Sequence, residues 1–403
     1  MGCSSRHRTS LPTQLRRSPR SSATRRMYVM QVERFELHPV RLPLRAPFSH
    51  ARYRRRESHA IIVVLRCQTG LAGFGEILPR DYVTGETVES VLTTLGPAMG
   101  ARFTGRHFDD RTSVVTHLHR ELDHAGRHLA TFCGFETALL DLAGHAFGFA
   151  LGKVLGRKAG PPLPAGTVIG FDVTTEALPR HAAVMRLRHT RHVKMKVGLV
   201  DDVERLTIVA EALGAPLRID ANAAWESAAE AVRRLRSMRA IPLASVEQPL
   251  APYDFVGARR IRQETGIPVV ADEGLCTGED ADRLIEERAA DIFNIRLAKC
   301  GGLLGALRLV ERAQANGLRC HLGTMVGESG ILTRLAELFG RFVHGFDWLD
   351  GKGQNAWLLA NDVLEEPHAA VHAPISASGL GVRVSRDRIS RFTMLGENHG
   401  PTR

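Results

Sequence analysis

Residues 216–250 read PLRIDANAAWESAAEAVRRLRSMRAIPLASVEQPL, and this stretch decides the fold. Its two ends are short apolar runs that predict β-strands, and SAAEAVRRLRSM between them has the apolar spacing of an amphipathic helix. A strand, a helix and a second strand in this order predict two parallel strands joined by a crossover helix. Asp220 and Glu247 stand where these two strands end.

The same rhythm continues on both sides of this stretch. Strands spaced by roughly 22–30 residues, each followed by a helix or connector, are typical of a parallel βα barrel. A doubly wound open sheet is the alternative, but no glycine-rich phosphate loop follows the first strand. The predicted fold class is α/β, a (β/α) TIM-type barrel over residues 161–364. Its eight candidate strands are GTVIGF, HVKMKVG, PLRIDAN, ASVEQPL, PVVADE, IFNIRLA, LRCHLGT and HGFDWLD.

The segments on either side of the barrel predict a second domain. Residues 30–160 open with strand-like alternation, in VERFELHPVRLPL and SHAIIVVLRCQTGLAGFGEI, and continue with helical periodicity. Strands followed by helices predict an α+β capping domain. Residues 365–403 resume the alternation, and we expect this C-terminal segment to return to the capping domain.

The N-terminal end is strongly basic. Residues 1–30 hold seven arginines and no acid, which is most of the formal net charge of +11. Such a Ser-, Arg- and Pro-rich stretch cannot bury a core, so residues 1–29 are predicted to be a disordered basic extension. A wrong start site, with Met27 or Met30 as the initiator, a basic tail and a transit-like peptide are the open readings. Because the excess charge is concentrated there, it does not predict a nucleic-acid partner.

The cysteine pattern and the hydropathy limit the classes of protein to which this chain could belong. The six cysteines are scattered without a C-x-x-C pair, which favours reduced thiols over a disulfide framework or a zinc site. No window approaches about 18 consecutive apolar residues, so we expect no transmembrane helix and no membrane partner. These features predict a cytoplasmic protein.

Three acids end three successive predicted strands: Asp220, Glu247 and Asp272. Their separations of 27 and 25 residues are one βα unit each, so the three should lie side by side at one rim of the barrel. Converging carboxylates repel one another, and a hard divalent cation removes that cost. Oxygen ligands suit Mg²⁺, with Mn²⁺ as the alternative metal. Independent helix-capping or salt-bridging acids are the structural alternative.

Lys194 and Lys196 end the strand before these acids. Two residues apart on a strand, they should point the same way, into the barrel mouth. Mutual repulsion and partial burial are expected to lower the pKa of the lysines, which would make one of them a general base. A pair of surface cations is the alternative. Beside three carboxylates, the lysines predict Mg²⁺-dependent removal of a proton alpha to a carboxylate, with stabilisation of the enediolate.

This ordered set of motifs resembles the enolase superfamily, and within it the muconate-lactonizing enzyme subgroup of the mandelate racemase/muconate lactonizing enzyme family. The resemblance implies that Asp220, Glu247 and Asp272 bind Mg²⁺, and that Lys196, supported by Lys194, is the acid/base on one face of the substrate. It covers most of the chain and rests on KMK, IDANAAW, EQP, ADE, KCGG and GLGV, with GFGEILPRDYVTGETVESV and ETALLDLAGHAFGFALGKVLG in the capping domain.

The chain departs from this subgroup at one position. The subgroup usually carries a second lysine in a segment like NIKLxKxGG, whereas this chain reads NIRLAKCGG with Arg296, 24 residues after Asp272. Lys299 has the opposite parity on the strand, so we expect Arg296 to face the site. A guanidinium stays protonated and is a poor base. Arg296 is therefore expected to act as a fixed cation.

A site with one lysine base favours a lyase or cycloisomerase acting on a small carboxylate substrate. An epimerase or racemase of N-acyl amino acids or dipeptides is the enzyme alternative, and a non-catalytic metal-dependent small-molecule binding protein is the other. The resemblance also implies a homo-oligomer.

Candidate substrate contacts are weaker signals. Arg52 lies in the arginine-rich loop APFSHARYRRRES, for which a solvated hairpin tip is the alternative. Tyr82 lies in a second loop, and Glu328 follows the seventh predicted strand, where it could equally cap a helix. Asp350 ends the eighth predicted strand. Dipeptide epimerases of the subgroup carry an Asp-x-Asp motif there that holds the substrate ammonium. Here the spacing from Asp347 to Asp350 is one residue too long, so this role is not transferred.

Overall fold

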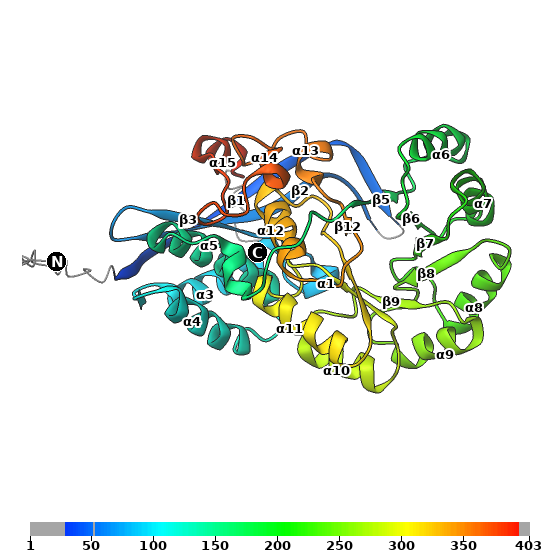
Figure 1. Ribbon diagram of the computed structural model, residues 1–403, viewed down its shortest axis with the longest axis horizontal. Coiled ribbons are helices and arrows are strands. Elements are labelled where there is room, and N and C mark those ends of the chain that lie inside the picture. Colours follow the sequence, from blue (N-terminus) through cyan, green and yellow to red (C-terminus); the bar gives the residue numbers. More distant parts are fainter. Residues whose placement is uncertain (1–28, 51–52, 395–403) are drawn as a thin grey trace, which may run out of the picture.

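The computed structural model describes residues 29–50 and 53–394. Figure 1 shows two packed parts, a barrel ringed by helices α6 to α11 and a sheet with its own helices. Residues 1–28, which make up nearly all of the predicted disordered extension, and the candidate contact Arg52 lie outside the described residues. The domain boundaries expected from the sequence stay predictions.

The barrel consists of eight parallel strands that close in the order β10-β11-β12-β5-β6-β7-β8-β9. Closure confirms the predicted TIM-type barrel and excludes the doubly wound open sheet. The strands are β5 (Ala165–Ile169), β6 (Val193–Lys196), β7 (Leu217–Asp220), β8 (Leu243–Glu247), β9 (Val269–Ala271), β10 (Ile292–Ile295), β11 (Arg319–Leu322) and β12 (Leu349–Asp350).

A helix follows each barrel strand. Helix α8 shows why these segments are helical. At the start of α8, the side chain of Ser227 accepts a hydrogen bond from the backbone N–H of Glu230. The buried residues of α8 recur at helical spacing, on the face toward the strands. The set is α6 (Leu178–Leu187), α7 (Asp202–Leu213), α8 (Ala228–Ser237), α9 (Phe255–Thr265), α10 (Gly278–Glu286), α11 (Gly302–Ala315), α12 (Gly330–Phe342) and the short α13 (Gln354–Trp357).

The second part, called the cap below, is an antiparallel sheet covered by helices. Its strands run in the order β3-β2-β1-β4, with β1 (Met30–His50), β2 (Tyr53–Cys67), β3 (Ala72–Ile77) and β4 (His107–Phe108). Helix α5 (Leu129–Phe147) packs on β3 so closely that a side chain at Gly75 would collide with the carbonyl oxygen of Gly134. The other helical segments are α1 (Asp81–Thr84), α2 (Val88–Ser90), a π-helical turn (Val91–Leu95), α3 (Gly96–Phe103), α4 (Arg111–Asp123) and a 3₁₀ turn (Leu151–Leu155).

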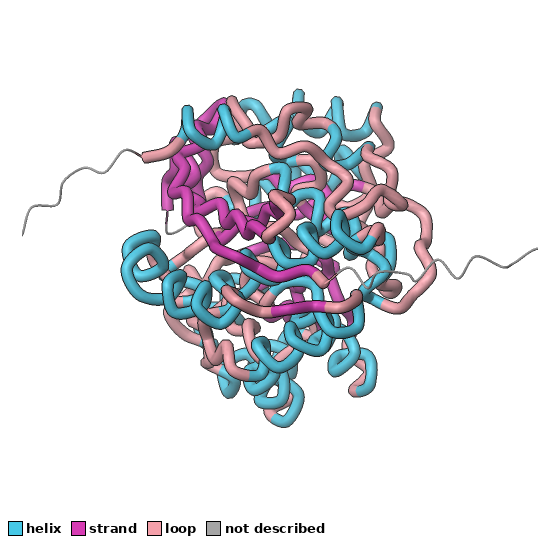
Figure 2. The backbone as a smooth tube through the Cα atoms, turned by 90° about the vertical axis from the view of Figure 1, so that its left-hand side faces the viewer, coloured by secondary structure: helices cyan, strands magenta, loops and turns pink. Residues whose placement is uncertain are grey.

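The C-terminal segment lies against the cap. Thr393 pairs with Val40 of β1, and Figure 1 shows α14 (Ala369–His372) and α15 (Arg386–Phe392) beside that strand. Figure 2 shows strands running across the near side of the molecule, with helices above and below them. In the part of the chain that the structure describes, no helix is both long and apolar enough to cross a membrane.

Two buried carboxylates of the cap bind the first turns of two barrel helices. Glu136 of α5 accepts hydrogen bonds from the backbone N–H groups of Leu303 (2.7 Å) and Leu304 (2.9 Å), at the start of α11. Glu76 of β3 accepts from the N–H (2.9 Å) and hydroxyl (2.6 Å) of Ser329, where α12 begins. Helix N-termini present unpaired N–H groups, so the cap completes the barrel's own helices.

Glu136→Gln should make the stability of the protein less sensitive to a rise in pH from weakly acidic to neutral. Burial raises the pKa of Glu136 from its ordinary 4.5 to about 8, although the two N–H donors oppose the shift. Between these pH values the folded state binds the proton of Glu136 more tightly than the unfolded state does. The free energy of unfolding therefore falls as pH rises, by up to about 1.4 kcal/mol per pH unit. Glutamine keeps an acceptor oxygen but does not titrate.

Thermal unfolding at pH 5.5 and pH 7.5 checks this expectation. The melting temperature of Glu136→Gln relative to the unaltered protein should rise by several degrees between the two conditions. An identical pH dependence for both proteins would show that Glu136 does not titrate differently in the folded state.

Candidate active site

The ends of the barrel strands and the cap enclose one pocket at the barrel mouth. Charged groups of the barrel form its floor, including Lys194, Lys196 and Arg296. Phe48 and Tyr82 of the cap lie over them, and the remaining lining residues are Val168, Asn222, Glu273, Asn294, Gly323, Thr324, Met325, Val326, Asp350, Gly351, Gln354, Trp357 and Leu358. The pocket lining therefore combines cationic and anionic side chains with apolar ones.

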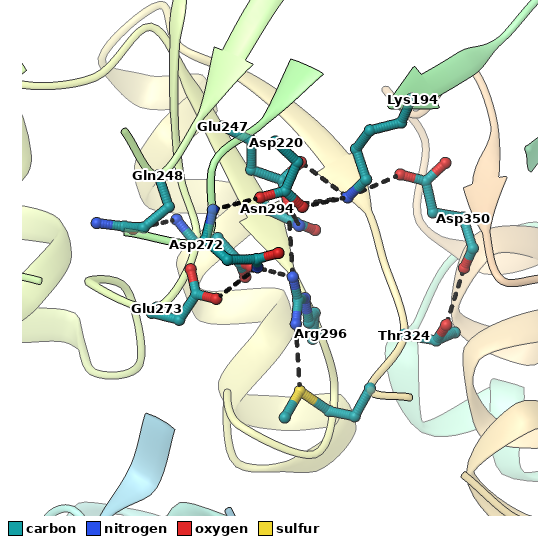
Figure 3. A network of polar contacts seen from close by, with 12 residues as sticks. Lys194, Asp220, Glu247, Gln248, Asp272, Glu273, Asn294, Arg296, Thr324 and Asp350 are labelled. Atoms are coloured by element: carbon teal, nitrogen blue, oxygen red, sulfur yellow. Dashed lines mark hydrogen bonds and ion pairs between the residues drawn. The ribbon is translucent and has the colours of Figure 1, made fainter. Parts of the chain in front are cut away.

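The two lysines of β6 point the same way, as their spacing predicts, and both contact buried acids. Lys194 Nζ donates to both carboxylate oxygens of Glu247, at 2.9 and 3.0 Å, and lies 3.2 Å from Asp220 Oδ2. Lys196 Nζ donates to Asp220 Oδ2 and to Asn222 Oδ1, each at 2.6 Å. Figure 3 shows Lys194 reaching toward Glu247 and Asp220.

Arg296 faces the same site, and Lys299 does not. Arg296 stands one residue beyond β10 and lines the pocket; its Nη2 contacts Asp272 Oδ2 and lies 3.3 Å from Glu247 Oε1 (Figure 3). Lys299 is buried and donates to the backbone carbonyls of Asn294 (3.0 Å) and Leu275. The pocket lining thus agrees with the expectation that Arg296 faces the site, although Lys299 lies in the turn after β10, where strand parity no longer applies.

The expected lowering of lysine pKa is wrong for Lys194. Burial disfavours its charged form, but the carboxylates of Glu247, Asp220 and Asp350 outweigh that cost and raise the pKa of Lys194 well above its ordinary value. Burial likewise opposes the charge of Asp220, yet Lys196 and Lys194 hold the pKa of Asp220 far below its usual range. Opposite charges close by dominate the mutual repulsion of the lysines.

Asp220, Glu247 and Asp272, called the acidic triad below, meet at the ends of β7, β8 and β9 as the strand spacing predicts. Their donor set is oxygen only, and the buried Asp272 Oδ1 has no hydrogen-bond partner, which suits a hard divalent cation. In the arrangement of the described residues, however, no three Asp, Glu, His or Cys side chains are placed to hold a metal ion together. The triad is instead paired with Lys194, Lys196 and Arg296.

A second buried ion pair lies beside the lysines. Arg218 donates from its two terminal nitrogens to the two oxygens of Asp350, each at 2.8 Å, and its guanidinium stacks 4.4 Å from the ring centroid of Trp348. Burial opposes the charge of Asp350, but the hydrogen bonds and charge of Arg218 lower the pKa of Asp350 to about 2. Asp350 also lies 3.6 Å from Lys194 Nζ, so its charge is shared between two cations.

The three candidate substrate contacts have different outcomes. Tyr82 lines the pocket, and the guanidinium of Arg55 lies 5.7 Å from its ring centroid. Arg52 lies outside the described residues. Glu328 is buried and accepts a hydrogen bond from the N–H of Met325 at 2.7 Å; burial raises its pKa to about 8, and it is absent from the pocket lining. The expectation that Glu328 contacts substrate is therefore not supported by its position, because its carboxylate binds its own loop.

Several pocket residues were missed from the sequence. Asn294 precedes Arg296 by two residues on β10, and its amide donates to Glu247 Oε1 at 2.9 Å. The same parity rule that selected Arg296 could have found it. Asn222 and Glu273, which share a 3.0 Å hydrogen bond, each lie two residues beyond the end of a strand, where parity gives no guide. Trp357 comes from α13, a helix too short to show periodicity.

Comparisons with known proteins point to one family. The family model described as Enolase C-terminal domain-like matches residues 177–388. N-succinyl-L-Arg/Lys racemase of Bacillus cereus is 30% identical over 305 residues, which are 74% of this chain and 81% of the relative. Muconate cycloisomerase 1 of Pseudomonas putida is 26% identical over 385 residues, 90% of this chain and 98% of the relative.

A solved structure extends the agreement to the fold. Muconate lactonizing enzyme from Pseudomonas fluorescens, complexed with muconolactone, has a TM-score of 0.80 and 27% identity, covering 91% of this chain and 100% of that chain. The similarity thus spans cap and barrel together. The chain therefore belongs to the enolase superfamily, whose muconate-lactonizing subgroup it fits at modest sequence identity.

Proposed function

We propose that this protein removes a proton alpha to the carboxylate of a small substrate, with Lys196 as its one base, and acts as a lyase or cycloisomerase. The observation that carries the proposal is the identity of the groups on opposite sides of the pocket. Strands β6 and β10 lie four strands apart in either direction around the barrel, so Lys196 and Arg296 enter from opposite sides. Only one of the two is a group that readily accepts a proton.

The chain's own residues have distinct tasks in this scheme. Lys196 Nζ takes the proton from the substrate carbon, and the electrons of the broken C–H bond move toward the substrate carboxylate. Asn222 accepts a hydrogen bond from Lys196 and fixes its direction, while Phe48 and Tyr82 cover the mouth and exclude water. In elimination the same Lys196 passes the proton to the leaving group. In the ring-closing direction of a cycloisomerisation, a substrate carboxylate adds to a double bond and Lys196 gives its proton to the alpha carbon of the resulting enediolate; in the ring-opening direction Lys196 takes that proton as the C–O bond breaks.

The acidic triad is the proposed Mg²⁺ site. When bound, Mg²⁺ would supply positive charge where the substrate carboxylate gains electron density. Removing divalent cations with EDTA should therefore abolish proton exchange, and adding Mg²⁺ should restore it. Exchange measured by mass spectrometry in chelated and Mg²⁺-restored samples checks this; full exchange in the chelated protein would contradict a metal requirement.

The reaction itself is tested by exchange in deuterated water. The purified protein with Mg²⁺ is incubated with N-acyl amino acids, dipeptides and lactone-forming acids, and deuterium and configuration at the alpha carbon are followed by mass spectrometry and chiral separation. Elimination, cyclisation, or exchange with retained configuration would support one-base chemistry. Deuterium gained with inversion would contradict it.

An epimerase or racemase is the second candidate. It is favoured by the 30% identity to N-succinyl-L-Arg/Lys racemase over 81% of that relative. Two-face chemistry would require a group other than a charged guanidinium to exchange a proton on the Arg296 side. Inversion in the deuterium experiment is the result that would select it.

A further inference from the structure

We propose that Arg296 is a built-in counter-cation of the acidic triad, and that a divalent metal ion must displace its guanidinium from Glu247 and Asp272. The inference rests on the proposed function in one respect, that these acids are the metal ligands. It adds that the chain sets its own metal affinity through the residue at position 296.

The contacts of Arg296 show what holds its guanidinium. Nη2 contacts Asp272 and lies 3.3 Å from Glu247 Oε1, and both acids are almost completely buried. The other nitrogens are weakly held: Nη1 lies 3.5 Å from the sulfur of Met325, and the buried Nε has no hydrogen-bond partner. Figure 3 shows the guanidinium directed at the acids. The charged contacts of this guanidinium are therefore with Asp272 and Glu247 of the triad.

Each member of the triad has a different set of cationic neighbours. Asp220 is contacted by both Lys194 and Lys196, and Glu247 accepts two hydrogen bonds from Lys194. Asp272 has Arg296 in direct contact, while Lys299 Nζ is 3.8 Å from its other oxygen and donates elsewhere. A buried carboxylate without a close counter-charge is strongly destabilising. Arg296 therefore does for Asp272 what a metal ion would otherwise do.

Arginine suits this task better than lysine does. Its planar, always protonated guanidinium presents several donors in a fixed fork and can contact two carboxylates at once, whereas an ammonium is a single point charge. A lysine at position 296 should therefore compete less strongly with a divalent cation. The pairing predicts weak metal binding by the unaltered protein and tighter binding once the guanidinium is removed.

Metal binding is measured directly, without substrate. Mn²⁺ is titrated by calorimetry into the unaltered protein, Arg296→Met, Arg296→Lys and Arg312→Met. Arg312 forms an ion pair with Asp282 at 2.7 Å on the surface and serves as the matched arginine control. Arg296→Met should bind Mn²⁺ about tenfold or more tightly than the unaltered protein, in line with couplings between close charges, and Arg296→Lys should lie between them. Arg312→Met should match the unaltered protein.

Thermal unfolding gives a second readout. Metal-free Arg296→Met should melt below the unaltered protein because Asp272 loses its closest counter-charge and keeps Lys299 at 3.8 Å. Saturating Mn²⁺ should raise the melting temperature of this variant by more than that of the unaltered protein. If Arg296→Met does not fold without metal, the comparison of Arg296→Lys with the unaltered protein carries the affinity test.

The outcomes separate this inference from the proposed function. Equal Mn²⁺ affinity in the unaltered protein and both Arg296 variants would overturn the competition while leaving the metal site in place. Weaker binding by the variants would overturn it too, because Arg296 would then assist the metal. Absence of Mn²⁺ binding in every variant would overturn both the inference and the metal role in the proposed function.

Discussion

Lys196→Ala should slow deuterium incorporation at the substrate's alpha carbon by about 10²–10⁴-fold, the usual contribution of a positioned general base. Two amines line the pocket among the described residues, those of Lys194 and Lys196. Lys194 is held by both oxygens of Glu247, whereas Lys196 projects from the end of β6 between Asp220 and Asn222. The rate is measured with any substrate that the unaltered protein exchanges in deuterated water.

The matched variant Lys196→Arg separates a base from a fixed cation. Arginine keeps the positive charge near Asp220 but cannot accept a proton under ordinary conditions, so this variant should be about as slow as Lys196→Ala. Recovery of exchange in Lys196→Arg would mean that position 196 supplies charge alone. Exchange by Lys196→Ala within tenfold of the unaltered rate would place the base elsewhere.

Arg218→Met should lower the free energy of unfolding by about 3–5 kcal/mol, because it leaves Asp350 charged and buried without its principal partner. Both hydrogen bonds of the pair are 2.8 Å long, and both side chains are at least nine-tenths buried. The substitution also removes the cation that stacks on Trp348. Denaturant unfolding of the two proteins at neutral pH gives the difference.

An exposed pair provides the control for this effect. Arg260 and Glu264 lie four residues apart on α9 at 2.6 Å, and Arg260→Met should cost far less stability than Arg218→Met because solvent screens the pair. In the double variant Arg218→Met/Asp350→Asn the loss should be smaller than the sum of the single losses, because no unpaired charge remains. Additive losses would show that the two side chains do not stabilise the fold as a pair.

Residues whose direction follows from a strand could be predicted from the sequence. Asp220, Glu247 and Asp272 were found because parallel strands end at one rim, and Lys194 and Lys196 because residues two apart share a face. Arg296 was distinguished from Lys299 by the same parity. These inferences need the strand and its position in the barrel, and nothing about distant contacts.

Partners brought together by closure could not be predicted. Arg218 and Asp350 are 132 residues apart and meet because β12 pairs with β5 to close the barrel. The expected direction of the Lys194 pKa is wrong because the charges of Glu247, Asp220 and Asp350, which all come from other strands, outweigh the effect of burial. Glu328 lies near the expected place, but its carboxylate turns back to Met325, which only the loop conformation decides.

The two carboxylates that reach from the cap into the barrel limit how this enzyme can be re-engineered. A barrel expressed alone would expose the first turns of α11 and α12, so a minimal scaffold must keep α5 with Glu136 and β3 with Glu76. Phe48 and Tyr82, by contrast, reach the pocket from other positions on the cap. Exchanging the end of β1 and helix α1 with those of relatives should change substrate preference while the contacts of Glu136 and Glu76 with the barrel stay intact.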